Sequence, residues 1–329
     1  MKRFLLVFIC VILLAAIVTW YAITQPLFGS DETGNSPVPL VVKDLADDLQ
    51  RHVKKLSVDL VPRDYRSVAT LDEAGEYIRA ELAKSNGEVS LQAFNVKGQR
   101  YYNIIAAFGP LTAERIVIGA HYNSYEKLPG ADDNASGVAG LIALADMLKN
   151  ATLKHRVELV AYTLEEPPYF RTENMGSYVH AHRLAAERAS VKLMISLECI
   201  GYFTDAPSTQ DFPVPGLGMM YPTAGNFIAI VGRYQDRAYA RAVKRAMSGA
   251  TKLPAHSISA PAFVQGIDFS DQLNYWAEGF PALMITDTAF FRNKAYHTKD
   301  DTFDRLDYQR MADVVRGAYA AVMAVNVMP

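Results

Sequence analysis

RIVIGAHYNSYEKLPGADDNASG, residues 115–137, joins a short apolar segment to a polar loop that leads into a helix. Residues 115–120 are almost all apolar, and the pattern predicts a buried strand there and a helix over 136–147. Strands that are apolar on both faces are typical of parallel sheets with helices packed on each side. The stretch therefore indicates an α/β unit in which polar residues follow the end of a buried strand.

The rest of the chain repeats this alternation of strand and helix. Further strands are expected at 157–163, 193–197, 227–231 and 283–285, and further helices at 175–185, 236–247 and 308–325. Before them, the pattern predicts helices over 41–56 and 70–82 and a pair of strands over 89–96 and 101–108, around a turn at Lys97 and Gly98. The fold class is α/β, a three-layer α/β/α sandwich around a mixed, mostly parallel central sheet.

The N-terminal segment is strongly apolar. Lys2 and Arg3 precede an apolar run over 4–23, and Asp31 and Glu32 follow it. About twenty residues at about 1.5 Å each span a hydrocarbon core of roughly 30 Å, whereas the apolar region of a signal peptide has about 7–15 residues. We therefore expect a membrane anchor over 1–23, a linker over 24–40 and one large domain over 41–329.

The charges around this segment predict its orientation. Basic residues before the run and acidic residues after it place the N-terminus in the cytoplasm and the domain in the periplasm or outside the cell. A cleaved signal that releases a secreted form is the alternative, and a cytosolic protein with a buried N-terminal helix is a third.

Composition and cysteine usage exclude several classes of protein. The chain of 329 residues has a formal net charge of -2 and no block of like charge, so the electrostatic footprint of a nucleic-acid-binding protein is absent. Cys10 lies in the apolar N-terminal run, whereas Cys199 lies at an expected buried strand. The two cysteines are therefore not expected to pair, and the fold has no disulfide framework.

Polar residues gather where the expected strands end. In a largely parallel sheet, ligands bind at the carboxyl ends of the strands, so side chains that follow several strands are expected to meet. Carboxylates in such a place are costly to bury unless a positive charge neutralises them. The candidate residues are His121, Asp133, Glu165, Glu166, Glu198 and His297.

A pair of divalent cations is the neutralising charge that these residue types favour. Neutral imidazole and carboxylate oxygens are ordinary zinc ligands, and one carboxylate can bridge two ions about 3.5–4 Å apart. Two zinc ions would lower the pKa of a bridging water to about 7, and a further carboxylate would take its proton and pass it to a leaving amine. The adjacent Glu165 and Glu166 can supply both a ligand and this general base.

Each feature alone has a simpler interpretation. A single histidine at a strand end is usually structural, and a pair of glutamates is usually a solvated loop. The acidic loop at 130–137 can serve as a helix cap, through Asn134 or Ser136. His180 and His182 lie two positions apart on an expected helix, so they do not face each other and are interpreted as surface residues. Only the coincidence of the whole set at strand ends indicates a metal site.

The same stretches resemble the co-catalytic zinc aminopeptidases of peptidase family M28. The resemblance runs in order from about residue 40 to the C-terminus, and relatives include glutamate carboxypeptidases, single-zinc glutaminyl cyclases and non-enzymatic transferrin-receptor-like proteins. It implies the sandwich fold of the zinc exopeptidases, which is phosphorylase/hydrolase-like, and a zinc peptidase domain over 41–329. The stretches that carry it are GAHYNS, LPGADDNASG, LEEPPYFRTENMGS, SLECIGYF and TDTAFFRNKAYHTKDDTFDRLD.

The resemblance also implies a role for each candidate residue. It assigns His121 and Glu198 to one zinc ion, and Glu166 and His297 to a second. Asp133 would bridge the two ions, and Glu165 would be the general base. Tyr296 resembles a tyrosine that stabilises the oxyanion in some members of the family, although a tyrosine in this loop can equally be a packing residue.

Three positions depart from the pattern of the family. Asn123 stands where an aspartate usually accepts the second ring N–H of the first histidine, and its amide oxygen can accept that hydrogen bond without the negative charge. Glu198 stands where the third carboxylate is often an aspartate, and Gln272 follows Ser270 and Asp271 where many relatives have a histidine. No expected metal ligand is lost by these changes.

The resemblance implies a metallo-aminopeptidase that binds two zinc ions and hydrolyses peptides outside the cytoplasm. A glutaminyl cyclase, which performs a transamidation on one zinc ion, is the alternative enzyme, and the intact His121 disfavours it. The non-enzymatic alternative is a membrane-tethered binding protein with a weakened site, which only Asn123 and Gln272 support.

Overall fold

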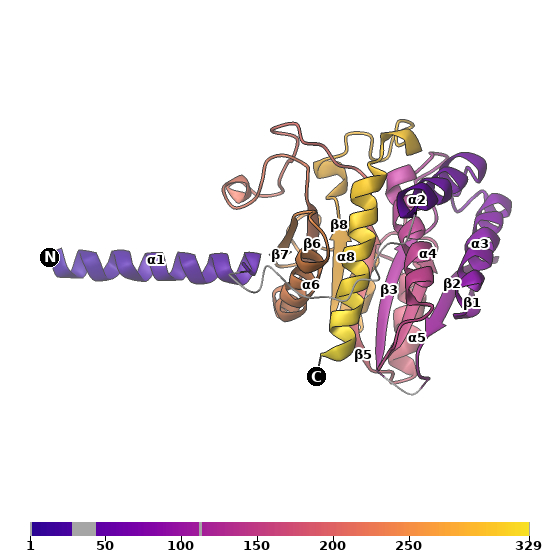
Figure 1. Ribbon diagram of the computed structural model, residues 1–329, viewed down its shortest axis with the longest axis horizontal. Coiled ribbons are helices and arrows are strands. Elements are labelled where there is room, and N and C mark those ends of the chain that lie inside the picture. Colours follow the sequence, from indigo (N-terminus) through magenta and orange to yellow (C-terminus); the bar gives the residue numbers. More distant parts are fainter. Residues whose placement is uncertain (1, 28–43, 112–113, 329) are drawn as a thin grey trace.

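An eight-stranded mixed sheet forms the centre of the protein (Figure 1). The computed structural model describes residues 2–27, 44–111 and 114–328. The strands are β1 Glu88–Val96, β2 Gln99–Phe108, β3 Arg115–His121, β4 Arg156–Tyr162, β5 Val191–Glu198, β6 Ile228–Gly232, β7 Ala255–Ser259 and β8 Ala282–Thr286. Their order across the sheet is β1-β2-β4-β3-β5-β8-β6-β7.

The middle of the sheet is parallel. Strands β4, β3, β5 and β8 run in one direction, whereas β2 is antiparallel to β4 and β6 is antiparallel to β8. The expected mixed, mostly parallel sheet is therefore confirmed. Because the four central strands are parallel, their carboxyl ends lie at the same edge of the sheet.

Helices cover both faces of this sheet, which confirms the three expected layers (Figure 1). They are α2 Leu45–Lys54, α3 Val68–Leu82, α4 Gly137–Leu148, α5 Gly176–Ala186, α6 Arg237–Ala250, α7 Gln272–Ala277 and α8 Tyr308–Val327. Strand β3 shows how the layers form: Ile116 and Ile118 belong to one apolar cluster, and Val117 belongs to the other. Residues of α2, α3, α4, α6 and α8 complete the first cluster, and residues of α5 and α7 complete the second.

Two short elements have no counterpart among the expected ones. Strand β7 has five residues, AHSIS, in which apolar and polar side chains alternate only briefly. Helix α7 has six residues, which is too short for a helical period to emerge from the sequence. Helix α7 was missed because of its length, whereas β7 was missed because polar residues interrupt it; β6 and β8 are equally short but continuously apolar.

A separate helix, α1 Lys2–Thr24, contains the apolar N-terminal run. Among the described residues it is the one helix that is long and apolar enough to cross a membrane, a property that anchors and signal sequences share. Its C-terminal end packs on the domain, where Lys244 Nζ and Ser257 Oγ donate to the Thr24 carbonyl at 3.0 and 2.8 Å. Of the linker expected over 24–40, residues 28–40 lie outside the described part of the chain.

Candidate metal centre

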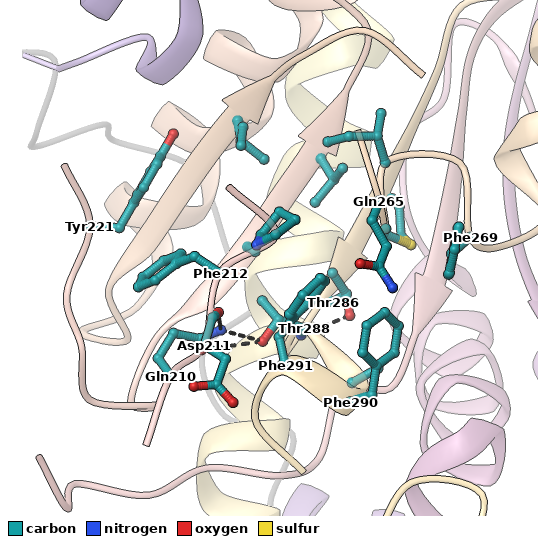
Figure 2. A pocket seen from close by; sticks show the side chains of 18 of the residues that line it. Gln210, Asp211, Phe212, Tyr221, Gln265, Phe269, Thr286, Thr288, Phe290 and Phe291 are labelled. Atoms are coloured by element: carbon teal, nitrogen blue, oxygen red, sulfur yellow. Dashed lines mark hydrogen bonds between the residues drawn. The ribbon is translucent and has the colours of Figure 1, made fainter. Parts of the chain in front are cut away.

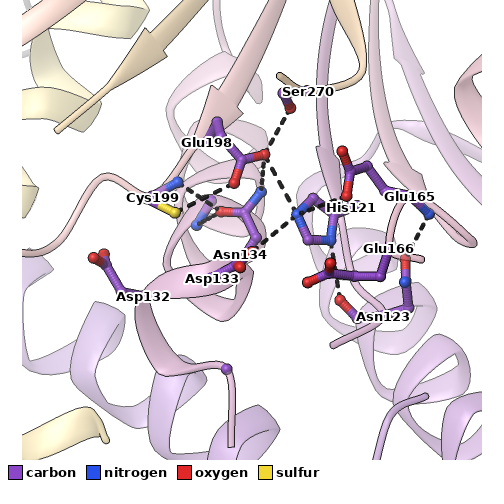
Figure 3. Close-up of polar contacts among 12 residues, drawn as sticks. His121, Asn123, Asp132, Asp133, Asn134, Glu165, Glu166, Glu198, Cys199 and Ser270 are labelled. Atoms are coloured by element: carbon purple, nitrogen blue, oxygen red, sulfur yellow. Dashed lines mark hydrogen bonds and ion pairs between the residues drawn. The ribbon is translucent and has the colours of Figure 1, made fainter. Parts of the chain in front are cut away.

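Strand ends bring four of the candidate residues to one edge of the sheet (Figure 3). His121 is the last residue of β3, and Glu198 is the last residue of β5. Glu165 and Glu166 follow the end of β4. Because β4, β3 and β5 are adjacent and parallel, the four side chains converge above the sheet.

Asp133 lies at the centre of the cluster. Its Oδ1 is 3.2 Å from His121 Nε2, and its Oδ2 is 2.9 Å from His297 Nε2. Glu198 Oε2 lies 3.3 Å from His121 Nε2, and Glu166 Oε2 lies 3.3 Å from His297 Nε2. Two triads thus share Asp133, and the ligand atoms within each triad lie within 4.8 Å of one another. One carboxylate between two ligand sets is what a two-metal site needs; the ligand roles themselves stay predictions.

Glu165 lies beside both triads. Its Oε2 is 3.9 Å from His121 Nε2, farther than the carboxylates of Asp133 and Glu198. A third possible grouping, His121 with Glu165 and Glu166, meets the same distance limit but lacks the shared Asp133. Glu165 is therefore the carboxylate that the two triads leave for another role.

Asp301 holds the loop that carries Asp133. Its two carboxylate oxygens accept hydrogen bonds from the main-chain N–H groups of Asp132 and Asp133, at 3.0 and 3.1 Å. Asp132 in turn accepts from the Gly201 N–H and from the Asn293 side-chain amide, both at 3.0 Å. The sequence does not identify Asp301, because the contacts of its carboxylate with Asp132 and Asp133 join segments that are 168 or more residues apart in the chain.

Arg63 is fully buried beneath the same loop and was also missed from the sequence. Burial lowers the pKa of its guanidinium to about 10. The guanidinium donates hydrogen bonds to the main-chain carbonyls of Leu56, Tyr122, Pro129 and Gly130. Tyr122 follows His121 directly, and Gly130 begins the turn that carries Asp133. One cation therefore connects the two loops.

Two neighbours fix the carboxylate of Glu198. The hydroxyl of Ser270 donates to Glu198 Oε2 at 2.6 Å. The side-chain amide of Asn134 donates to the same oxygen at 3.5 Å (Figure 3). The amide oxygen of Asn134 accepts from the N–H groups of Cys199 and Gly137, both at 3.1 Å. Asn134 therefore caps the start of α4, as one of the two expected caps, and also holds the end of β5.

The expected role of the Asn123 side chain is wrong. The main-chain carbonyl of Asn123, not its amide, lies 3.0 Å from His121 Nδ1 and occupies the place of the expected second-ring partner. The side-chain oxygen of Asn123 instead accepts from the main-chain N–H of Glu165 at 3.1 Å. The sharp turn after β3 brings the carbonyl to the imidazole, so this departure from the family pattern bears on Glu165 rather than on His121.

The pKa shifts in the cluster indicate that its carboxylates need additional positive charge. Burial lowers the pKa of His297, but Asp133 and Glu166 outweigh it and raise that pKa to about 11. Burial also lowers the pKa of His121, but the nearby carboxylates outweigh this effect and raise that pKa well above its usual value. Burial raises the pKa of Glu166 to about 7 and that of Glu165 well above its usual range. Protons or cations must therefore balance these acids, and a dication is the stronger counter-charge.

Unpaired buried atoms show that the residues fit zinc. Among the described residues, Glu166 Oε1 has no hydrogen-bond partner, and Asp133 Oδ2 and His297 Nε2 face each other at 2.9 Å without forming a hydrogen bond. Buried polar atoms without partners are rare in folded proteins unless a water or an ion satisfies them. Imidazole nitrogens and carboxylate oxygens in groups of three are the donors that zinc prefers. His121, Asp133 and Glu198 would hold one ion, and Asp133, Glu166 and His297 would hold another.

An apolar cavity adjoins the cluster (Figure 2). It has Glu198 and Tyr296 in its wall, so it reaches the candidate metal centre. Tyr296 lies in this wall with its ring stacked on the His297 ring at 3.9 Å between centroids. Aromatic side chains make up much of the remaining wall, namely Phe212, Tyr221, Phe227, Phe269, Phe290 and Phe291.

Gln272 does not form part of this cavity wall. Its side chain is fully buried and donates to the Ile267 carbonyl at 3.0 Å. This departure from the family pattern therefore lies behind the cavity wall, where Gln272 contacts the wall residues Ile267 and Met284.

His180 is not the surface residue that the sequence suggested. It is completely buried, with Nδ1 2.6 Å from the Tyr275 hydroxyl and Nε2 3.6 Å from Glu158 Oε2. The two histidines do point apart, as expected, and His182 is the exposed one. The sequence pattern showed that they do not share a face but not which face of α5 meets the sheet.

This fold is that of the zinc exopeptidases. The zinc aminopeptidase from Bacillus subtilis superposes with a TM-score of 0.68 at 13% identity, covering 86% of this chain and 95% of that structure. The glutaminyl cyclase of Porphyromonas gingivalis superposes with a TM-score of 0.64 at 20% identity, covering 85% and 99%. At such low identities the likeness concerns the fold alone.

Sequence comparison gives the family. Residues 103–322 match Peptidase family M28, and the chain belongs to this family. It is 48% identical to the uncharacterized protein YfbL of Escherichia coli K12, over 82% of this chain and 85% of that protein. It is 23% identical to a probable leucine aminopeptidase of Arthroderma otae, over 90% and 77%. The protein is thus a member of a family of peptide hydrolases, and the family implies zinc.

Proposed function

We propose that the protein is an aminopeptidase that works with two zinc ions. The observation that carries the proposal is the position of Asp133, whose two oxygens face the imidazoles of different triads at 3.2 and 2.9 Å. A site for a single ion would have no use for both oxygens in this arrangement. When bound, the two ions supply Lewis acidity that activates a water molecule and polarises the carbonyl of the scissile bond.

Glu165 is the proposed general base. Its main-chain N–H is held by Asn123, and its carboxylate lies at the edge of the two triads. From there it can take a proton from the attacking water and later deliver it to the leaving amine. Tyr296, in the cavity wall beside His297, is placed to donate a hydrogen bond to the developing oxyanion.

The apolar cavity is the proposed site for the side chain of the amino-terminal residue. Its aromatic wall favours large apolar side chains, because removing such surface from water is worth about 25 cal/mol per Å². Acidic side chains would lose their hydration there without gaining a partner, because no lysine or arginine lines the cavity. Names of curated relatives that mention leucine agree with this preference.

We further propose that α1 anchors the enzyme in a membrane, with the N-terminus in the cytoplasm and the catalytic domain in the periplasm or outside the cell. The apolar run and the charges on its two sides support this orientation. A cleaved signal would instead release the domain.

Hydrolysis of a matched set of substrates tests the proposed activity. Leucine p-nitroanilide should be hydrolysed, aspartate p-nitroanilide should be hydrolysed more slowly, and N-acetyl-leucine p-nitroanilide should not be hydrolysed, because an aminopeptidase requires a free amino group. Peptides that begin with glutamine serve as the control for cyclase activity. Cyclisation of these peptides without hydrolysis of the leucine substrate would overturn the proposal in favour of a glutaminyl cyclase.

A further inference from the structure

The end of the domain that meets α1 is built from β7 and α6. The Thr24 carbonyl accepts from Lys244 on α6 and from Ser257 on β7, at 3.0 and 2.8 Å. The Arg241 guanidinium lies over the Tyr21 ring at 5.9 Å. Because these contacts fix the end of α1 directly on the domain, the β7 edge of the sheet lies where α1 would leave a bilayer (Figure 1).

A loop without charged residues extends from the same end of the domain. Residues 212–221, FPVPGLGMMY, are called the apolar loop here. Figure 1 shows that this segment, which contains Leu217–Met219, projects on the side of the domain from which α1 extends. Met219 is 88% exposed, and Val214 and Met220 are exposed by 43% and 41%. Exposed apolar side chains gathered in one segment indicate a surface that contacts a protein or a membrane.

One residue of β7 connects the apolar loop to α1. The Tyr221 hydroxyl donates to the Ser257 carbonyl at 2.8 Å, and the Ser257 hydroxyl donates to the Thr24 carbonyl at 2.8 Å. The loop and the last turn of α1 are therefore neighbours in space, although about 190 residues separate them in the chain.

The elements behind the loop carry an excess of positive charge. Residues 237–267, which include α6 and β7, contain no aspartate or glutamate, in a chain with a net charge of -2. The excess does not form a block, because its members are spread through the segment. The two acids that flank the apolar loop, Asp205 and Asp211, pair with Arg310 and Lys294. The basic residues of 237–267 are Arg237, Arg241, Arg245 and Lys252, together with Lys244, which is buried and donates to α1 instead of facing outward.

We propose that the apolar loop and the basic edge formed by α6 and the turn before β7 rest on the surface of the bilayer that α1 crosses. The inference depends on the proposed membrane anchor. Apolar side chains such as Met219 enter the boundary between headgroups and acyl chains, while basic side chains meet anionic headgroups. A bilayer is the occupant that the structure favours, because α1 would bring lipid directly to this face. The same loop walls the cavity through Phe212 and Tyr221, so the cavity lies close to the membrane surface.

Tryptophan fluorescence of the full chain in lipid vesicles tests this proposal. Trp20 lies in α1, and Trp276 is buried in the domain. In a Trp20→Phe background, Met219→Trp places a reporter in the apolar loop. Leu111→Trp is the matched control, because Leu111 is an exposed apolar residue, 71% exposed, after β2 near the opposite edge of the sheet. The vesicles carry lipids brominated on the acyl chain near the headgroup, which quench tryptophan on contact.

The tryptophan at 219 should be quenched and its emission shifted to the blue, whereas the one at 111 should be unaffected. Quenching should be stronger in vesicles that contain phosphatidylglycerol than in phosphatidylcholine alone, and it should weaken with added salt. Quenching at 219 that is equal in the two lipids would contradict the role of the basic edge.

Two other results would overturn the proposal. If the tryptophan at 219 stays as accessible to acrylamide as the one at 111, the apolar loop does not touch the bilayer. If it is shielded from acrylamide but not quenched by the brominated lipid, a protein partner or a second copy covers the loop. The native Trp20 separates these failures from failure of the anchor, because it is quenched in the unmodified chain only if α1 lies in the membrane.

Discussion

Glu165 and Glu166 are neighbours in the sequence, yet the fold gives their carboxylates different surroundings. Glu166 Oε2 lies 3.3 Å from His297 Nε2, within one of the triads that share Asp133. Glu165 lies outside both of these triads, and Asn123 holds its main-chain N–H. The turn after β4 thus separates a proposed ligand from a proposed base.

Replacement of the proposed base should remove catalysis without removing metal. Glu165→Gln keeps the size of the side chain but cannot accept a proton, so kcat should fall by about 10²–10⁴-fold, the usual contribution of general acid–base catalysis. Hydrolysis of leucine p-nitroanilide and zinc analysis of the same samples measure both quantities. Glu173→Gln, an exposed position on the same loop, is the control. A Glu165→Gln enzyme with full activity would show that another group takes the proton.

The candidate site residues could be predicted from the sequence, but the group that each side chain contacts could not. His121 and Glu198 could be singled out because they follow apolar strands, and Asp133 because it lies in the polar loop before the next helix. The position of the Asn123 amide was predicted wrongly, because the sequence does not show the path of the turn after β3. Arg63 and Asp301 were missed for a related reason: their acceptors and donors are main-chain groups of distant segments.

At the scale of elements, two loops and one buried cation determine the geometry of the site. Arg63 joins the end of β3 to the turn before α4 through main-chain carbonyls. A buried carbonyl that loses its donor is costly, and hydrogen bonds from a charged donor contribute more than neutral ones. The loops of the metal centre therefore depend on Arg63 although it is not part of the proposed ligand set.

Removal of this cation should destabilise the domain. Arg63→Met should lower the free energy of unfolding by about 3 kcal/mol or more, because several buried carbonyls lose a charged donor. Arg63→Lys should restore part of the loss, and Arg66→Met, at an exposed position, should leave stability nearly unchanged. Urea denaturation measures all three variants. Unchanged stability in Arg63→Met would mean that water replaces the guanidinium at no cost.

His52, in helix α2, should make the free energy of unfolding depend on pH. Burial lowers the pKa of His52 to about 4, below the value of about 6.5 in an unfolded chain. The unfolded state therefore binds the proton first, so the contribution of His52 to stability is complete above about pH 6.5 and is lost as the pH falls toward 4, by about 3 kcal/mol.

The free energy of unfolding measured between pH 7 and 4.5 tests this dependence. His52→Gln should show a shallower fall than the wild type. Tyr77→Phe removes the hydroxyl that contacts the His52 ring but keeps the imidazole, so it should retain the slope. Equal slopes for the wild type and His52→Gln would assign the acid sensitivity to other groups.

At the scale of the whole molecule, the parallel part of the sheet was the most predictable feature. The strand expected at 157–163 is β4 Arg156–Tyr162, and the strand expected at 193–197 lies within β5 Val191–Glu198. Continuous apolar runs produce this agreement, because burial on both faces requires them. The edge of the sheet beyond β8 was harder to predict from the sequence, because β7 is short and partly polar. The contact of α1 with this edge joins residues more than 200 positions apart and leaves no local pattern.

The central claim is that acids and imidazoles at the strand ends form one site for two metal ions that share Asp133. Zinc content per chain, measured after chelation and reloading, tests it most directly. The wild type and the control Asp300→Asn, at an exposed position in the His297 loop, should bind two zinc ions per chain. Asp133→Ala should bind fewer than two, because both triads lose a ligand. One zinc ion or none in the wild type, or two in Asp133→Ala, would contradict the claim.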